Sequence, residues 1–214
     1  MTAKHSDILF IQLPTPLINF EIPRENTLNA AGYLISYYKS RNLDCQKYNF
    51  IIPEHTINDY YGDSALLDYI EKLKPTVIGF SYYCWNISRT IYIASEIKKR
   101  LGSVRIIFGG PEITPDNSYL LLQSPADFLV AGEGEAVFEY LLASNFQPTN
   151  DSRGLILPNA DDDNQFYFNG YYPAIKSLDE IRSPYLTGIL KPEPQGFIRF
   201  ETMRGCRNKC SYCF

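Results

Sequence analysis

Residues 76–112 read TVIGFSYYCWNISRTIYIASEIKKRLGSVRIIFGGPE, and this stretch decides the fold. Its two ends, 76–82 and 104–108, are apolar runs with the length of a buried strand. Between them, the apolar residues of 91–101 recur at helical spacing, and Gly102 follows as a helix stop. A strand, a helix and a strand in such close succession predict a crossover connection between two parallel strands.

The same alternation of strand and helix extends to both sides of this stretch. Further apolar runs of strand length occur at 7–13, 43–52 and 126–130. Apolar residues recur at helical spacing at 28–38, 66–73, 115–122 and 137–142. Five strands alternating with five helices predict an α/β protein with a doubly wound, five-stranded parallel sheet of the flavodoxin-like kind. We expect the strand order 2-1-3-4-5.

The composition changes after about residue 145. Segment 146–164 is rich in Pro, Asn and Asp, and 154–157 with 165–169 are suited to a small hairpin around an acidic turn. A strand is predicted at 197–201, directly before a group of cysteines. The expected organisation is therefore a doubly wound domain at 1–145, a linker with a small hairpin at 146–196 and the start of a third unit at 197–214.

The composition also excludes several classes of protein. The 214 residues carry a formal net charge of −4, so no basic stripe is available to bind nucleic acid. No apolar run approaches the roughly 20 residues of a membrane-spanning helix, and the first residues do not read as a signal peptide. Five Cys are too few for a disulfide scaffold. We expect a soluble, cytoplasmic protein that binds neither nucleic acid nor a membrane.

The loops after the predicted strands carry the candidate binding residues, because doubly wound sheets bind ligands outside the carboxyl ends of their strands. Gly109-Gly110 and Gly132-x-Gly134 allow close backbone approach or a positive φ, while Ser81 and Asn86 offer hydrogen-bonding side chains. Each feature alone also suits an ordinary tight turn or polar loop, but three such loops on one edge favour a cofactor crevice. The sequence has no Gly-x-Gly-x-x-Gly after the first strand and no Walker-type loop, which argues against a dinucleotide or phosphate-loop enzyme.

Cys206, Cys210 and Cys213 lie within eight residues of one another. Cys thiolates at such short spacings hold iron–sulfur clusters, and three ligands to a [4Fe-4S] cluster leave one iron open for another ligand. Arg204 and its basic neighbours would lower the pKa values of these thiols and offset an anionic cluster. A zinc site would need a fourth ligand, and neither of the two His residues is near in sequence. A zinc site and three unligated cysteines remain the alternatives.

Residues 201–214, ETMRGCRNKCSYCF, resemble the cluster motif of radical S-adenosylmethionine (SAM) enzymes, with Arg-Gly before the first Cys and an aromatic residue before the last. The preceding domain, with GGPE at 109–112 and GEGE at 132–135, resembles the cobalamin-binding domain of one large subgroup. This subgroup includes magnesium-protoporphyrin IX monomethyl ester cyclase-like proteins. The linker residues 178–180 and 183–186 resemble the usual connection, so the resemblance covers nearly the whole chain.

The resemblance implies three cofactors: a [4Fe-4S] cluster, SAM and cobalamin. Cys206, Cys210 and Cys213 would each ligate one iron, the fourth iron would bind SAM, and Tyr212 would lie near the adenine. An electron donor such as a flavodoxin or ferredoxin would reduce the cluster, which would cleave SAM to methionine and a 5′-deoxyadenosyl radical. The full-length protein would act on a small-molecule substrate.

The expected cobalamin contacts lie in the loops at the strand ends, with the loop from Pro14 onward facing the lower side of the corrin. These residues are Pro14, Thr15, Ser81, Tyr82, Asn86, Gly109, Gly110, Pro111, Glu112, Gly132, Glu133 and Gly134.

The sequence departs from cobalamin domains of the mutase type in two elements. Those domains carry Asp-x-His-x-x-Gly after the first strand, whereas residues 13–17 here read LPTPL, and the Ser-x-Leu element is changed to Ser-Tyr-Tyr at 81–83. Either cobalamin binds with its lower cobalt face unligated, or the domain is vestigial and binds nothing.

The sequence given ends one residue after Cys213, whereas radical SAM enzymes need a partial (β/α) barrel, of which 197–201 would be the first strand. We therefore expect no enzymatic activity from this chain alone. Three interpretations remain open. The first is the N-terminal portion of a cobalamin-dependent radical SAM enzyme, a methyltransferase or a tetrapyrrole cyclase-like enzyme. The second is a radical SAM protein whose first domain serves for docking, and the third is a stand-alone metal-binding protein.

Overall fold

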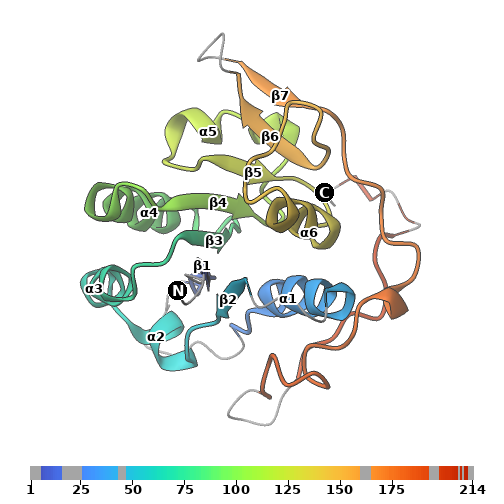
Figure 1. Cartoon of the computed structure of the whole chain (residues 1–214), viewed down its shortest axis with the longest axis horizontal. Helices are drawn as coiled ribbons and strands as arrows, with labels where there is room; N and C mark the ends of the chain where they lie inside the picture. The colour runs from blue at the N-terminus through green and yellow to red at the C-terminus, as the bar shows by residue number, and fades with distance from the viewer. Residues whose placement is uncertain are drawn as a thin grey trace.

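A seven-stranded sheet with the strand order β2-β1-β3-β4-β5-β6-β7 forms the centre of the molecule (Figure 1). The structure is a computed structural model that describes residues 6–15, 26–42, 47–159, 165–192, 198–206, 208 and 210–211. The parallel strands are β1 (Ser6–Ile11), β2 (Tyr48–Ile51), β3 (Val77–Ser81), β4 (Arg105–Gly109) and β5 (Phe128–Val130). Their order confirms the predicted sequence 2-1-3-4-5.

The hairpin predicted in the linker is formed by β6 (Leu155–Pro158) and β7 (Phe166–Phe168), but it belongs to the main sheet. Strand β6 pairs antiparallel with β5, and Ile156 lies opposite Leu129. The sheet therefore has two strands more than the five predicted. Without β6, the backbone of β5 would form an unpaired edge, and residues 155–157 would lose the burial that they have in this position.

Helices cover both faces of the sheet, as the alternating pattern predicts (Figure 1). The helices are α1 (Asn29–Arg41) and α6 (Glu135–Ala143) on one face, and α3 (Asp63–Leu73), α4 (Ile87–Leu101) and α5 (Leu120–Gln123) on the other. Each face encloses its own cluster of buried apolar side chains, and the central strands contribute to both. In the described part of the chain, no helix is both long and apolar enough to span a membrane.

Two helical segments differ from the predictions. Helix α2 (His55–Tyr60) has no apolar periodicity, and its buried residues are the polar Asn58 and Asp59. Asn58 donates a hydrogen bond of 2.8 Å to the carbonyl oxygen of Gln12, which fastens α2 to the end of β1. The helix predicted at 115–122 is divided into a 3₁₀ turn, η1 (Pro115–Asn117), and the short helix α5.

After β7 the chain runs along the outside of α6 and α1 and forms a second 3₁₀ turn, η2 (Leu178–Glu180) (Figure 1). Two features of α1 hold this linker. The linker residue Leu190 packs against Gly32, where an added Cβ would lie 2.7 Å from Leu190 Cγ. The Ser36 hydroxyl donates a hydrogen bond of 2.5 Å to the carbonyl oxygen of Arg182.

The strand predicted at 197–201 is not found in its described residues, 198–201. Backbone N–H groups in this segment instead donate to tyrosine hydroxyls: Arg199 to Tyr185 at 3.1 Å and Glu201 to Tyr33 at 3.0 Å. A strand needs a neighbouring strand for its backbone hydrogen bonds, and none lies beside this segment in the described residues.

Candidate functional site

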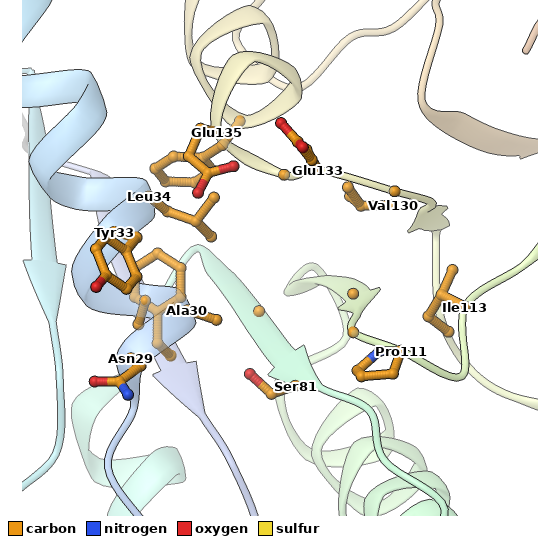
Figure 2. A pocket seen from close by; sticks show the side chains of 18 of the residues that line it. Asn29, Ala30, Tyr33, Leu34, Ser81, Pro111, Ile113, Val130, Glu133 and Glu135 are labelled. Atoms are coloured by element: carbon orange, nitrogen blue, oxygen red, sulfur yellow. The ribbon is translucent and has the colours of Figure 1, made fainter. Parts of the chain in front are cut away.

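A cavity of about 820 Å³ opens at the carboxyl ends of the parallel strands, between the sheet and helices α1 and α6 (Figure 2). Strands β1, β3 and β4 form its floor, and α1 and α6 form one wall. The rim consists of the loops after β3, β4 and β5 together with residues from the segment 199–205. Its volume falls within the range of ligand pockets, roughly 300–1,000 Å³.

The cavity reaches close to the sheet because the central strands carry small residues on this face. Gly109 of β4 lies opposite Ser81 of β3, and Gly79 is two residues before Ser81, so all three face the same side of the sheet. A Cβ added at Gly109 would lie no nearer than 3.7 Å to any protein atom, and one at Gly79 no nearer than 3.4 Å. Packing within the protein therefore does not require either glycine. Their missing side chains leave space that a ligand can fill.

Gly110 has a different role from Gly109. Its φ is +126°, and an added Cβ would lie 2.6 Å from the carbonyl oxygen of Tyr82. Only glycine fits this close approach of two loops. The turn places Pro111 and Ile113 on the cavity rim (Figure 2).

The loop after β5 forms the opposite part of the rim. Gly132 has a φ of +84°, which agrees with the expected special backbone conformation, and an added Cβ would lie 2.9 Å from the Tyr171 ring. Glu133 and Gly134 follow it into α6 and also line the cavity. The carboxylate of Glu133 accepts a hydrogen bond of 2.8 Å from the backbone N–H of Ile175, which connects this loop to the linker.

Seven of the predicted contact residues thus line one cavity, and their binding of a cofactor stays a prediction. These residues are Ser81, Gly109, Gly110, Pro111, Gly132, Glu133 and Gly134. The other predicted contact residues in the described part of the chain do not line it: Pro14, Thr15, Tyr82, Asn86 and Glu112. Tyr212 lies outside the described residues.

Tyr82 and Asn86 have structural roles that explain why neither lines the cavity. The Tyr82 side chain is fully buried and stacks on Phe108, with ring centroids 4.9 Å apart. Burial raises the pKa of Tyr82 from 10.0 to about 12. The Asn86 amide donates to the carbonyl oxygens of Leu13 and Ser81, at 3.2 and 3.0 Å, and accepts from the backbone N–H of Tyr83 at 2.9 Å. Asn86 therefore joins the segment after β1 to the end of β3 and the loop that follows it.

Several cavity residues were not predicted. Helix α1 contributes Asn29, Tyr33 and Leu34 to the wall (Figure 2), although its periodicity indicates only a buried face. Tyr83 lines the cavity beyond β3 and stacks on Trp85, with ring centroids 4.4 Å apart. The segment 199–205 also reaches the rim, which only the tertiary fold could bring there.

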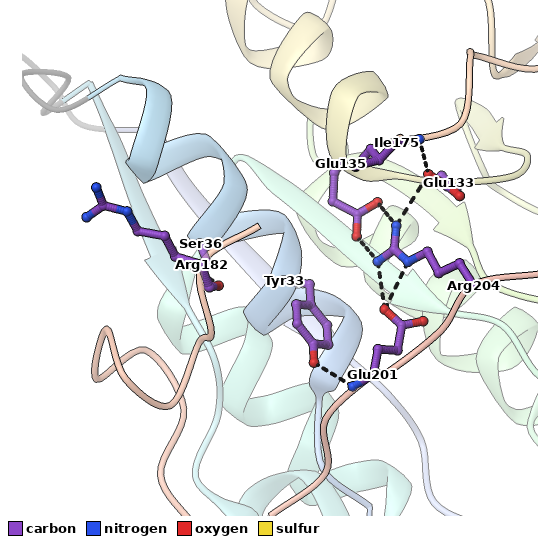
Figure 3. A network of polar contacts seen from close by, with 8 residues as sticks. All are labelled: Tyr33, Ser36, Glu133, Glu135, Ile175, Arg182, Glu201 and Arg204. Carbon is purple, nitrogen blue, oxygen red and sulfur yellow. Dashed lines mark hydrogen bonds and ion pairs between the residues drawn. The ribbon is translucent and has the colours of Figure 1, made fainter. Parts of the chain in front are cut away.

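Arg204 is the charged centre of this rim (Figure 3). Its guanidinium forks onto Glu135, with Nη1 and Nη2 at 3.0 and 2.5 Å from the two carboxylate oxygens, and its Nε lies 2.9 Å from Glu201. Burial by itself lowers the pKa of Arg204, but the hydrogen bonds to Glu135 and Glu201 more than offset this effect and raise the pKa above its ordinary value. The positive charge of Arg204, which we expect to act on the cysteine thiols, is therefore paired with the carboxylates of Glu135 and Glu201.

The cysteine motif is only partly described. Cys206 and Cys210 are exposed, and the Sγ of Cys206 accepts a long hydrogen bond of 3.4 Å from the backbone N–H of Asn208. Cys213 lies outside the described residues. Within the described ranges, no group of three His, Cys, Asp or Glu side chains is arranged to hold a metal ion. The predicted cluster ligands stay a prediction.

Residues 28–142 match the B12 binding domain family. Because this match spans more than half of the 214 residues, the chain belongs to that family. The matched region contains the carboxyl ends of β3, β4 and β5, the glycine loops, all of α1 and all but the last residue of α6.

Among known proteins, the chain is similar to two methyltransferases, one of which is named as a cobalamin-dependent radical SAM enzyme. It is 28% identical over 150 residues to the cobalamin-dependent radical SAM methyltransferase TokK of Streptomyces tokunonensis, covering 66% of this chain and 22% of TokK. It is 26% identical over 169 residues to the 2-(S-pantetheinyl)-carbapenam-3-carboxylate methyltransferase of Streptantibioticus cattleyicolor, covering 72% and 25% of the two chains. The chain thus spans about a quarter of the length of these relatives.

A solved structure has the same fold. The cobalamin-dependent SAM radical enzyme OxsB, with aqua-cobalamin and SAM bound, superposes with a TM-score of 0.60 at 17% identity, over 87% of this chain and 25% of OxsB. This likeness confirms the predicted α/β fold with a mostly parallel sheet.

Proposed function

We propose that this chain binds cobalamin in the cavity beneath α1 and α6, as the cobalamin-binding portion of a radical SAM methyltransferase. The observation that carries the proposal is the floor of small residues at the carboxyl edge of β3 and β4, in a chain of the B12 binding domain family. The similarity to two methyltransferases favours methyl transfer over the tetrapyrrole cyclase-like alternative.

The residues present fit a corrinoid. Cobalamin is a broad corrin ring with a nucleotide tail, so it needs an apolar space near the sheet and a wider opening outside it. The inner cavity is lined by the apolar side chains of Ile8, Phe10 and Ile107, whereas Ser81 and the glycine loops form the outer part. Gly79 and Gly109 would let the tail lie close to the strands. The bound group would supply a cobalt–carbon bond for methyl transfer.

The described residues offer no imidazole for the lower face of cobalt in this cavity. The sequence has only two His residues, and no described residue of the lining is a histidine. His55 lies at the start of α2, where it pairs with the buried carboxylate of Asp59. We therefore expect the cobalamin to bind without a lower histidine ligand.

Cys206, Cys210 and Cys213 would hold a [4Fe-4S] cluster, and SAM would bind at its open iron. Three thiols at this spacing suit that cluster, and the exposed Cys206 and Cys210 are accessible to it. The cluster would accept electrons from a flavodoxin- or ferredoxin-like donor. The substrate would be a small molecule bound by parts of the enzyme beyond this chain.

An anaerobic titration of the purified chain with hydroxocobalamin tests the proposal. We expect saturable binding by ultraviolet–visible spectroscopy. After reduction to cob(II)alamin, the electron paramagnetic resonance (EPR) spectrum should be of the base-off type, without nitrogen coupling from a lower ligand. Failure of a demonstrably folded chain to bind would exclude the proposal and leave docking as the function of the domain.

Metal analysis after anaerobic reconstitution tests the cysteine motif separately. Iron with an equal amount of inorganic sulfide is the expected result. Zinc without sulfide would instead support the third interpretation, a stand-alone metal-binding protein.

A further inference from the structure

Every N–H donor of Arg204 is directed at a carboxylate (Figure 3). Nε and Nη2 contact Glu201 at 2.9 and 2.8 Å, Nη1 and Nη2 contact Glu135, and Nη1 lies 3.4 Å from Glu133. These five contacts match the five donors of a guanidinium. The Arg204 side chain is 17% exposed and that of Glu135 only 5%, so the fork is largely shielded from water.

The three carboxylates belong to different parts of the rim. Glu135 is the first residue of α6, and Glu133 precedes it in the loop that is fastened to Ile175. Glu201 lies in the segment before the cysteines, and its backbone N–H donates to Tyr33 of α1. Arg204 therefore joins the segment that leads to the cysteines directly to α6 and, through Glu201, to α1.

A single residue separates Arg204 from Cys206. This residue, Gly205, has a φ of +77°, and an added Cβ would meet no atom within 4 Å. The glycine is thus required by the backbone conformation and not by packing. The anchor of Arg204 and the turn at Gly205 together set the direction in which the chain enters Cys206.

We propose that Arg204 is a positioning residue that holds Cys206 at the rim of the cavity by its fork on Glu135. The inference rests on the proposed function, because the position matters for a corrinoid in the cavity and a cluster on the cysteines. The Arg204–Glu135 pair would then do more than stabilise the fold, because through it the domain that binds the corrinoid would also fix the position of the first cluster ligand.

The geometry distinguishes this role from simple charge pairing. A lysine at 204 would keep the positive charge, but its ammonium group cannot form the two parallel hydrogen bonds of the fork or reach Glu135, Glu133 and Glu201 together. Arg204→Lys should therefore retain the charge and lose the position. A role limited to net charge predicts that Arg204→Lys behaves like the parent.

EPR spectroscopy can measure the position directly. The full 214-residue chain would carry serine at the other four cysteines and a nitroxide label on Cys206. Pulsed EPR would then report the dipolar coupling between the nitroxide and bound cob(II)alamin. The variants are Arg204→Gln, Arg204→Lys and Glu135→Gln. Arg100→Gln is the matched control, because Arg100 also pairs with two carboxylates but lies on α4, away from the cavity.

We expect a single, narrow distance in the parent and in Arg100→Gln, and loss of this peak in all three rim variants. Retention of the peak in Arg204→Gln would overturn the inference. Circular dichroism would identify a variant that fails to fold, in which case Arg204→Lys decides.

Failure of the proposed function would look different, because the parent itself would then bind no cob(II)alamin. The continuous-wave nitroxide spectrum would still decide on Arg204, since it needs no corrinoid. Restricted label motion in the parent and fast motion in Arg204→Gln supports the positioning role, and equal motion in both contradicts it.

Discussion

The ring of Tyr82 stacks on the ring of Phe108, with centroids 4.9 Å apart and an angle of 19° between the planes. This pair lies in the core on the side of the sheet opposite the cavity, and within the described residues the Tyr82 hydroxyl has no hydrogen-bond partner. A buried hydroxyl without a partner costs about 1–3 kcal/mol of desolvation. Tyr82→Phe should therefore raise the free energy of unfolding at pH 7 by about 1 kcal/mol, as measured by urea denaturation.

Tyr82 also makes the free energy of unfolding depend on pH in the alkaline range. Burial raises the pKa of Tyr82 in the folded chain to about 12, against 10.0 in the unfolded chain, so the unfolded chain loses its proton first. The resulting stability is fully present below pH 10.0 and is lost as the pH rises toward 12. The two-unit difference corresponds to about 2.7 kcal/mol. Tyr82→Phe should lack this alkaline loss. Equal alkaline loss in parent and variant would contradict the assignment.

Filling the cavity floor should weaken corrinoid binding without unfolding the protein. Gly109→Val would place a branched side chain where the nearest protein atom is 3.7 Å from the Cβ position, so the strand can accept it. Overlap with a ligand typically costs about 1–3 kcal/mol, which corresponds to roughly tenfold or more in Kd. Hydroxocobalamin titration would measure this change. Gly62→Val is the control, because Gly62 also has free space around it but does not line the cavity.

The sequence predicts the sheet well because each strand is encoded by a local apolar run. The pairing of β6 with β5 is not local, and the apolar run at 155–157 fits a separate hairpin equally well until the edge of β5 is known. The short helix α2 cannot be predicted from apolar periodicity because its buried residues are polar, and their hydrogen-bond partners Gln12 and Asn26 are distant in the sequence.

In the candidate site, too, features with a local sequence signal can be predicted, whereas contacts between distant residues cannot. The loop glycines at 109–110 and 132–134 lie on the rim of the cavity, and their backbone freedom can be inferred from the sequence because it is a local property. Tyr82 was expected in the site beside Ser81, but adjacent strand residues point to opposite faces, and Tyr82 lies in the core on the other side. The pairing of Arg204 with Glu135 cannot be predicted from the sequence, because Glu135 is 69 residues earlier in the chain.

Gly32 provides a test of how the linker is held on α1. An added Cβ would overlap Leu190 and lie 3.1 Å from Pro184. Alanine is about 1 kcal/mol more favourable than glycine within a helix, whereas overpacking costs about 1–3 kcal/mol. Gly32→Ala should therefore lower the free energy of unfolding slightly or leave it unchanged. Combined with Leu190→Ala, which removes the overlapping atoms, it should become stabilising relative to Leu190→Ala alone. Additive effects in this double-mutant cycle would show that the two residues are not in contact.

The lining of the inner cavity predicts which corrinoids the chain binds most tightly. The buried side chains of its lining are mainly apolar and include Ile8, Phe10, Val77, Ile107, Phe138 and Leu141. If the nucleotide tail enters there, the base of cobalamin, dimethylbenzimidazole, finds a matching surface. Adenine, the base of pseudocobalamin, carries an amine and ring nitrogens that these side chains cannot pair with. Each unpaired group costs about 1–3 kcal/mol, so pseudocobalamin should bind roughly tenfold or more weakly.

Parallel titrations with cobalamin, pseudocobalamin and cobinamide, which has no nucleotide, would measure this preference. We expect cobalamin to bind more tightly than pseudocobalamin. Cobinamide should also bind more weakly than cobalamin, because it leaves the inner cavity empty. Cobinamide binding as tightly as cobalamin would mean that the tail does not enter the cavity. Equal binding of the two complete corrinoids, with weak binding of cobinamide, would place the tail inside but assign the recognition to its ribose phosphate. The apolar lining would then contribute to the fold of the α1 and α6 face and not to the choice of ligand.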